Sequence, residues 1–251
     1  MKTKLTLWTA VLLGFCLSVQ VQADSSSGPD SDVAPTRISA LERPRIALSI
    51  FGGAERSQFS ACGDMNLFFN SPSQGKQLLA PNIGADLEFL LGRIISFGIG
   101  LDFNQRGQYV KRTTVRFNSS PFPHDFESKA TLRYCAVPLF VKARLEFGPQ
   151  WLGLRAALVP ALLVNDDVTW TVDGQEITPG TSVMPSLYIN ATDIRLRPSF
   201  EYGLRFGNNA VFCRAQYDYG IYSVATNLNG NIFTRAYGGV VGFTRFITIG
   251  N

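Results

Sequence analysis

The stretch IGADLEFLLGRIISFGIGLDF, residues 83–103, alternates apolar and polar side chains with a period of two. From residue 83 to 89 the odd positions are apolar, and the even positions hold Gly84, Asp86 and Glu88. From residue 95 to 103 the odd positions are again apolar, and the even positions hold only serine, glycine and aspartate. A helix would scatter this pattern around its axis, because its period is 3.6 residues. The stretch therefore predicts two antiparallel strands joined by a tight turn at Gly92-Arg93.

The same alternation continues along the rest of the chain and predicts eight strands. They lie at residues 45–52, 79–91, 94–108, 131–147, 151–164, 191–206, 210–222 and 232–246. Three of the connections are tight turns: Gly92-Arg93, Gly148-Pro149-Gln150 and Gly207-Asn208-Asn209. The other four connections are long, at residues 53–78, 109–130, 165–190 and 223–231. Because short and long connections alternate, an up-and-down meander puts all tight turns at one end and all long loops at the other.

These features predict the fold class as all-β, an eight-stranded antiparallel up-and-down transmembrane β-barrel over residues 44–247. Its apolar face would point to lipid and its polar face would fill the interior. The sheet must close on itself, because lipid offers no partner for unpaired backbone groups. Aromatic residues near strand ends are expected in a belt at the membrane interface; these are Tyr134, Phe147, Trp151, Phe206, Tyr219 and Phe246.

A soluble, lipocalin-like barrel is the competing architecture, and it would turn the same faces inside out. It would enclose the apolar face as a ligand cavity and leave the charges in water. The length of the strands and the glycine-studded polar faces of mixed charge favour the membrane barrel.

The N-terminus has the layout of a secretory signal peptide over residues 1–23. Lys2 and Lys4 precede an uncharged apolar run at residues 5–19, and Val21-Gln22-Ala23 forms a small-residue cleavage site. The apolar run is shorter than the roughly 20 residues that a transmembrane helix needs. A retained anchor and a lipoprotein modified at Cys16 are the alternatives, although the bulky Phe15 before Cys16 disfavours the second.

Residues 24–43 are rich in Ser, Asp, Pro and Gly and are expected to form a flexible periplasmic lead-in. The predicted location is the outer membrane of a Gram-negative cell envelope, with both termini in the periplasm and the long loops extracellular. The expected surroundings are outer-membrane lipid.

Composition excludes several classes of protein. The chain is 45% hydrophobic and 17% charged, which is too apolar for a disordered protein. The net charge of +4 comes without any basic run, so no nucleic-acid partner is expected. One histidine and no C-x-x-C spacing predict neither a metal site nor a cofactor. The mature chain would keep three cysteines, Cys62, Cys135 and Cys213, and this odd number does not form a disulfide framework. A disulfide between Cys135 and Cys213 is possible only if their strands lie close together.

The inward polar face carries charges of both signs. We predict that the following residues form a charge network in the lumen: Asp86, Glu88, Asp102, Lys142, Arg144, Glu146, Arg155, Arg195, Arg197, Glu201, Arg205, Arg214 and Asp218. With Arg106 and Asp193, which share this face, the interior holds seven acids and eight bases. Eight strands leave a lumen that side chains can fill. A salt-bridged plug is therefore the main interpretation, and an ion path is the alternative.

Three stretches resemble the PorT-like outer-membrane β-barrel family of Bacteroidota and their relatives. They are IGADLEFLLGRIISFGIGLDFNQRGQY, LRYCAVPLFVKARLEFG, and the final RPSFEYGLRFG, QYDYGI and RAYGGVVGFTRF. In the second stretch the similarity includes Tyr134, Val137-Pro138-Leu139 and Lys142. The resemblance implies an integral outer-membrane protein, and some members of the family assist the secretion of other proteins. One departure is that Phe246 is not terminal, because residues 247–251 follow it.

The function predicted from the sequence is of structural or adaptor type, without enzymatic activity, and contacts other envelope or secretion proteins. The alternatives are a lipid or small-molecule binder at the barrel mouth, a narrow pore, and a rim enzyme. The rim enzyme would use His124-Asp125 with the nearby Ser119 or Ser120, but no G-x-S-x-G or P-loop motif is present.

Two loop segments add weaker hypotheses. Asn165-Asp166-Asp167 has calcium-type ligands but lacks a glycine-anchored ligand loop. Residues 66–69, NLFF, could fold over the barrel mouth or form an apolar patch for a partner.

Overall fold

The computed structural model describes residues 45–63, 75–92, 94–116, 123–177, 188–227 and 230–248. All of them belong to one unit, residues 40–251. The predicted signal peptide, the predicted lead-in and the NLFF segment at residues 66–69 lie outside these ranges. Within the described ranges no helix is long and apolar enough to cross a bilayer.

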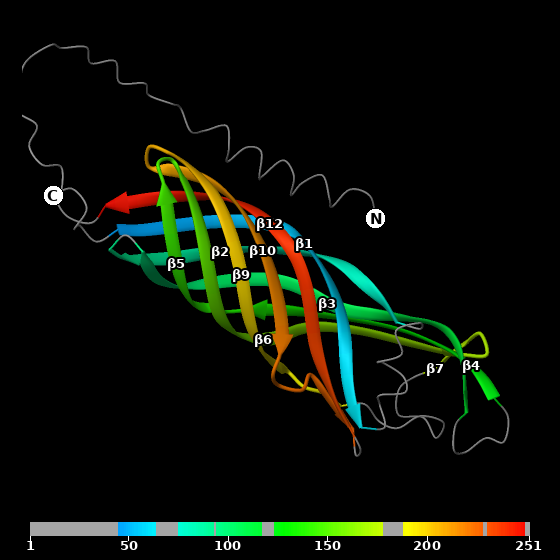
Figure 1. The fold of residues 1–251 in the computed structure, drawn as a ribbon. Coiled ribbons are helices and arrows are strands. Elements are labelled where there is room, and N and C mark those ends of the chain that lie inside the picture. Colours follow the sequence, from blue (N-terminus) through cyan, green and yellow to red (C-terminus); the bar gives the residue numbers. More distant parts are fainter. Residues whose placement is uncertain are drawn as a thin grey trace, which may run out of the picture. The chain divides into compact units, whose positions relative to one another are not determined.

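The described chain forms an antiparallel β-barrel (Figure 1). Hydrogen bonding runs in the order β1-β2-β3-β4-β6-β9-β10-β12, and β12 pairs back onto β1, so the sheet closes into a ring of eight strands. This ring is the predicted fold class. The bounds of the strands are β1 Arg45–Gly63, β2 Gly75–Leu91, β3 Ile95–Arg116, β4 Pro123–Ala136, β5 Leu139–Phe147, β6 Gln150–Val172, β7 Gln175–Ile177, β8 Tyr188–Ile189, β9 Thr192–Phe206, β10 Asn209–Gly220, β11 Ala225–Asn227 and β12 Gly230–Thr248.

One predicted strand, at residues 131–147, is interrupted and appears as β4 and β5. The break is at Val137-Pro138, because proline has no N–H to donate to the ladder. The path nevertheless stays in the ring. The Val137 N–H donates to the Pro160 carbonyl at 2.9 Å, and the Gly100 N–H donates to the Pro138 carbonyl at 2.8 Å. Both β4 and β5 pair with β3 and with β6, so together they occupy one place in the barrel.

The three predicted tight turns gather at one end of the barrel, here called the turn end. Gly92, Gly148 and Gly207 have φ angles of 71°, 63° and 62°, in the left-handed region that glycine adopts without strain. The first residue of β1, Arg45, pairs with Leu90 of β2 and with Thr248 of β12, so both ends of the described barrel also lie there.

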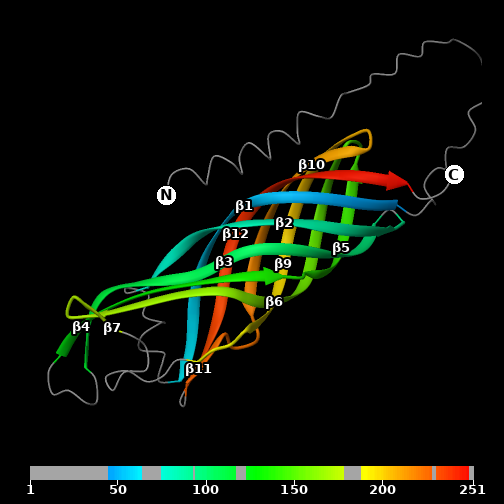
Figure 2. The same cartoon turned by 180° about the vertical axis from the view of Figure 1, so that it is seen from behind.

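The strands run further than the sequence predicted at the opposite end, here called the loop end. Parts of the predicted loops 53–78, 109–130 and 165–190 are strand, because β1 continues to Gly63 and β6 continues to Val172. The polar composition there hides the period-two signal, while the backbone ladder goes on. The outer parts of β3, β4 and β6, with the short β7, project beyond the other strands (Figures 1 and 2). We call this sheet, residues 108–116, 123–133 and 165–177, the loop-end extension.

The outer wall is apolar. Large hydrophobic side chains are exposed on every strand of the ring except β4, whose place in the wall is filled by exposed residues of β5; Val241 at 68%, Leu154 at 66% and Phe97 at 45% are examples. Three of the six aromatics predicted for an interface belt do point outward: Phe147, Phe206 and Tyr219. The prediction is wrong for Tyr134, Trp151 and Phe246, which lie on the inward face of their strands and are buried. Position near a strand end does not fix the face; the phase of the strand does.

Candidate functional site

The lumen holds a buried network of charged side chains. Fourteen charged residues on inward positions are less than 4% exposed, seven of them acids and seven of them bases. They are Glu55, Asp86, Glu88, Asp102, Asp193, Glu201 and Asp218, with Arg106, Lys142, Arg144, Arg155, Arg195, Arg197 and Arg214. Period-two geometry puts all of them on one face, and closure of the sheet turns that face into an enclosed interior.

The half of the network nearer the turn end is built around two glutamates and one aspartate. Lys142 Nζ lies 2.5 Å from Glu88 Oε2 and 3.1 Å from Glu201 Oε1. Arg144 Nη2 donates to Glu88 Oε1 at 3.0 Å. Glu201 Oε1 also accepts a hydrogen bond from the indole N–H of the buried Trp151 at 3.2 Å. Asp86 lies further in and accepts a bidentate pair of hydrogen bonds from Arg155.

The middle of the lumen is held by Asp86 and the two arginines that share it. Arg155 Nη1 and Nη2 donate to the two oxygens of Asp86 at 2.7 and 3.1 Å. Arg214 Nη2 donates to Asp86 Oδ2 at 3.0 Å and also lies 3.0 Å from Glu201 Oε2. The Arg155 guanidinium stacks over the Phe140 ring, 3.8 Å from its centroid. This bidentate geometry gives each charge a partner and a fixed direction.

The half nearer the loop end centres on Asp218. Arg197 Nε donates to Asp218 Oδ1 at 2.5 Å, Arg195 Nη1 donates to its Oδ2 at 3.3 Å, and Arg106 also pairs with it. Arg197 pairs in addition with Asp102. Three arginines therefore converge on one carboxylate. Sequence position gives no hint of this convergence, because the groups come from three different strands.

Eleven of the thirteen residues predicted for the network lie within it, and two do not. Glu146 and Arg205 have the inward phase, but they are the last such residues of their strands and reach the rim at the turn end. The Glu146 side chain is 40% exposed and its Oε1 is 3.9 Å from Arg144 Nη1. Arg205 Nε donates to the Gly207 carbonyl at 2.9 Å.

One member of the network was missed by the sequence reasoning. Glu55 pairs with Arg106 and accepts a hydrogen bond from Asn82 Nδ2 at 2.7 Å. It lies in a part of β1 that was predicted to be loop. The buried residues Ser49, Glu55 and Ser57 all occupy odd positions, so the period-two pattern of β1 does continue to Glu55. Polar residues on both faces of this segment make that pattern hard to recognise in the sequence.

Two apolar clusters lie in the interior beside the charged network. Towards the loop end, Phe59, Leu132, Val224 and Ile232 belong to one buried cluster. Towards the turn end a second cluster contains Phe51, Trp151, Phe212, Val240 and Phe246. Rings of both clusters contact the network, because the Arg155 guanidinium stacks on Phe140 of the first cluster and the Arg214 guanidinium stacks on Phe51 and Phe212 of the second.

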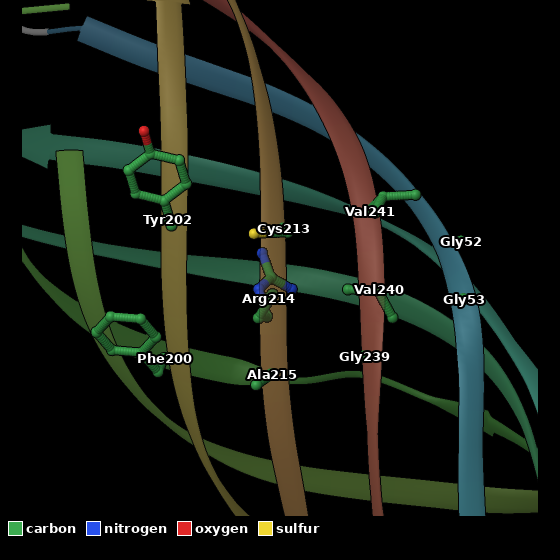
Figure 3. A pocket seen from close by; sticks show the side chains of 10 residues that line it. All are labelled: Gly52, Gly53, Phe200, Tyr202, Cys213, Arg214, Ala215, Gly239, Val240 and Val241. Carbon is green, nitrogen blue, oxygen red and sulfur yellow. The ribbon is translucent and has the colours of Figure 1, made fainter. Parts of the chain in front are cut away.

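The outer wall has a shallow hollow of about 340 Å³ where small residues of β1, β10 and β12 meet. Figure 3 shows Cys213 and Ala215 on β10, with Phe200 and Tyr202 of β9 beside them and Val241 on the other side. Its lining is mostly apolar, with Arg214 as the one charged residue among the residues that line it, and it opens on the outer wall. Cys135 and Cys213 are both free and lie on β4 and β10, with β6 and β9 between them in the ring, so the disulfide left open by the sequence does not form.

The loop-end extension contains the only histidine of the chain. His124 Nδ1 lies 2.6 Å from Asp173 Oδ2, and Asp173 Oδ1 accepts the Asp125 backbone N–H at 2.8 Å. Ser119 and Ser120, the nucleophiles considered for a rim enzyme, lie outside the described residues. In the described part of the chain no group of three or more His, Cys, Asp or Glu side chains is arranged to hold a metal ion.

Comparison with known proteins gives no family. No family model matches the chain, and no curated protein matches it. Similar solved structures include Neisserial surface protein A, with 12% identity over 79% of this chain and 97% of that chain, at a TM-score of 0.42. Outer membrane protein OprG from Pseudomonas aeruginosa is 9% identical over 83% of this chain and 97% of that chain, at a TM-score of 0.43. Outer membrane protein AlkL is 10% identical over 91% of this chain and 99% of that chain, at a TM-score of 0.37.

At identities and TM-scores this low, neither an activity nor a structural detail of these proteins can be assigned to this chain. The architecture stands on the chain's own strand pairing, in which β1 and β12 close the ring. A closed β-barrel with an apolar outer wall and a charged, filled interior is the arrangement of an integral outer-membrane protein.

Proposed function

We propose that this protein is an integral outer-membrane barrel of structural or adaptor type, related to the PorT-like proteins, whose lumen is a rigid core. Its loop-end extension would present a surface to other envelope or secretion proteins. The observation that carries the proposal is the pairing of seven buried acids with seven buried bases in an interior that also holds two apolar clusters. The relation to the PorT-like proteins is supported by the three stretches that resemble that family.

A lumen built in this way favours rigidity over conduction. Its formal charge is zero, because seven acids balance seven bases, and such balance gives no strong selectivity for either sign of ion. Each buried charge needs its partners, since removing one leaves an uncompensated charge in a low-dielectric interior. Ions that crossed the barrel would have to break these pairs in succession.

The loop-end extension offers a formed surface beyond the wall. Phe126 and Trp170 pack edge to face with ring centroids 6.5 Å apart, which joins β4 to β6. The Tyr109 hydroxyl donates to Glu127 Oε1 at 2.5 Å, and this hydrogen bond raises the pKa of Tyr109. A sheet braced in this way can present loops in a fixed geometry, which suits an adaptor.

The structure excludes the lipocalin-like barrel but does not test the rim enzyme. The lipocalin-like barrel requires an apolar interior and charges in water, whereas the described interior is charged and the wall is apolar; the inverted arrangement is therefore wrong. A rim enzyme would rely on the His124–Asp173 pair and a nucleophile near it. We infer a non-enzymatic role, and loss of a measured hydrolytic activity on His124→Ala would argue against that inference.

The first test is envelope fractionation with heated and unheated gels of the detergent extract. The proposal expects the protein in the outer membrane, a mobility shift on heating, and no stepwise conductance in planar bilayers. A soluble protein or regular conductance steps would contradict it.

The adaptor role needs its own test. A photo-crosslinker placed at Lys129, which is exposed on the extension, should capture a discrete envelope protein in living cells. The same crosslinker at Gln150, exposed at the turn end, is the matched control. Equal capture from both positions, or none from Lys129, would remove the adaptor role and leave the barrel itself untouched.

A further inference from the structure

The turn end of the lumen carries two arginines, Arg45 and Arg205, that lie outside the balanced network. At this rim, the last inward positions are Arg45 on β1, Arg205 on β9, and Arg144 followed by Glu146 on β5. Arg45 and Arg205 are half-buried. Against these two bases the rim has one acid, Glu146, among the described residues, so it adds 2 − 1 = +1 to the neutral interior.

Phe246 brings two of these guanidinium groups together. The Cζ atoms of Arg205 and Arg144 lie 4.7 and 5.4 Å from its ring centroid. Arg144 is also 4.9 Å from the Trp151 ring centroid, and Trp151 packs edge to face on Phe246 with centroids 6.4 Å apart. Both guanidinium groups are thus held against the same aromatic ring, because the face of such a ring attracts a cation.

Arg144 also has donors to spare. Its side chain is 4% exposed, and its Nη2 donates to Glu88, which Lys142 shares. Its Nε and Nη1 atoms are buried and have no hydrogen-bond partner within the described part of the chain. Glu146 Oε1 lies 3.9 Å from Nη1, beyond hydrogen-bonding distance. Buried donors of this kind are rarely left without an acceptor in native proteins.

We propose that Arg45, Arg144 and Arg205 form an oxyanion site at the turn-end mouth, and that its ligand is a phosphate group. A guanidinium presents paired N–H donors in a planar fork that matches the oxygens of phosphate, and several such groups around one mouth favour a doubly charged anion. The group can come from inorganic phosphate or from a phospholipid headgroup reaching over the rim. The inference does not depend on the adaptor role.

The test uses the full-length protein in an uncharged maltoside detergent, titrated with inorganic phosphate by calorimetry at low salt. The expected result is saturable binding of one phosphate per chain. Arg205→Gln should weaken it at least tenfold, and Arg45→Gln should weaken it as well. Arg245→Gln is the matched control, because Arg245 is exposed at the same end but points outward, and it should change affinity less than twofold.

Heated and unheated gels confirm that each variant is folded, which matters most for Arg144→Gln, since that residue also pairs with Glu88. Absence of saturable binding, or equal loss in Arg245→Gln, would overturn the proposal. Repeating the titration in phospholipid nanodiscs separates the sources. Retained binding identifies free phosphate as the ligand, whereas loss of binding there, after binding in detergent, identifies the lipid headgroup.

Discussion

Asp86 offers the sharpest test of the charged lumen. It is 3% exposed and accepts two hydrogen bonds from Arg155 and one from Arg214. Asp86→Asn keeps the size of the side chain and removes its charge, which leaves seven bases facing six acids. Arg214 keeps Glu201 as a partner, whereas among the described residues Arg155 keeps only the Phe140 ring as a direct contact.

Removing one member of a buried ion pair costs about 3–5 kcal/mol, because the remaining charge stays buried without compensation. With a urea dependence of about 2 kcal/mol per molar for the free energy of unfolding, Asp86→Asn should lower the urea midpoint by about 1.5–2.5 M. Unfolding of the barrel in lipid vesicles, followed by tryptophan fluorescence, to which the buried Trp151 and Trp170 both contribute, measures this midpoint.

The double variant Asp86→Asn/Arg155→Gln restores balance, with six acids and six bases. It should be more stable than the sum of the single losses predicts, by about 1–3 kcal/mol, because the two groups contact each other. Asp167→Asn, exposed on the loop-end extension, is the control and should stay within about 0.5 kcal/mol of the parent protein. A loss below about 1 kcal/mol for Asp86→Asn, or strict additivity in the double variant, would refute a tightly paired lumen.

Three further predictions concern the core, the wall and the loop-end extension. A Cβ at Gly203 would lie 2.0 Å from the Trp151 ring, so Gly203→Ala should destabilise the barrel by about 1–3 kcal/mol and shift the tryptophan emission. Gly239→Ala is the control and should change neither, because its Cβ would lie 3.7 Å from its nearest neighbouring atom. Leu154→Arg places a charge on the outer wall, where it should cost about 2–4 kcal/mol near the bilayer midplane; a change within about 0.5 kcal/mol would point to water outside the wall. Phe126→Ala removes half of an aromatic pair, so limited proteolysis should cut the extension faster while the mobility shift on heating persists.

Much of the lumen could be predicted because a strand alternates its side chains. Once residues 83–103 had set the phase, Asp86 and Asp102 had to share a face opposite the large apolar residues. The same rule explains the failures. Their position near strand ends predicts a membrane belt for Trp151 and Phe246, but their odd or even position in the strand turns both side chains inward. Glu146 and Arg205 have the right phase, but the barrel ends before they are enclosed.

The class of fold, the face of most residues and the end at which the three predicted tight turns gather could be predicted from the sequence, because they follow from local periodicity and turn chemistry. Which charges pair with one another is a property of the folded barrel. Asp218 lies on β10 and is reached by Arg106 from β3 and by Arg197 from β9, and Glu55 joins them only because β1 continues past its apolar part. Such pairs depend on register, on the tilt of the strands and on closure between β1 and β12. These are properties of the whole ring, to which every strand contributes, and no single segment encodes them.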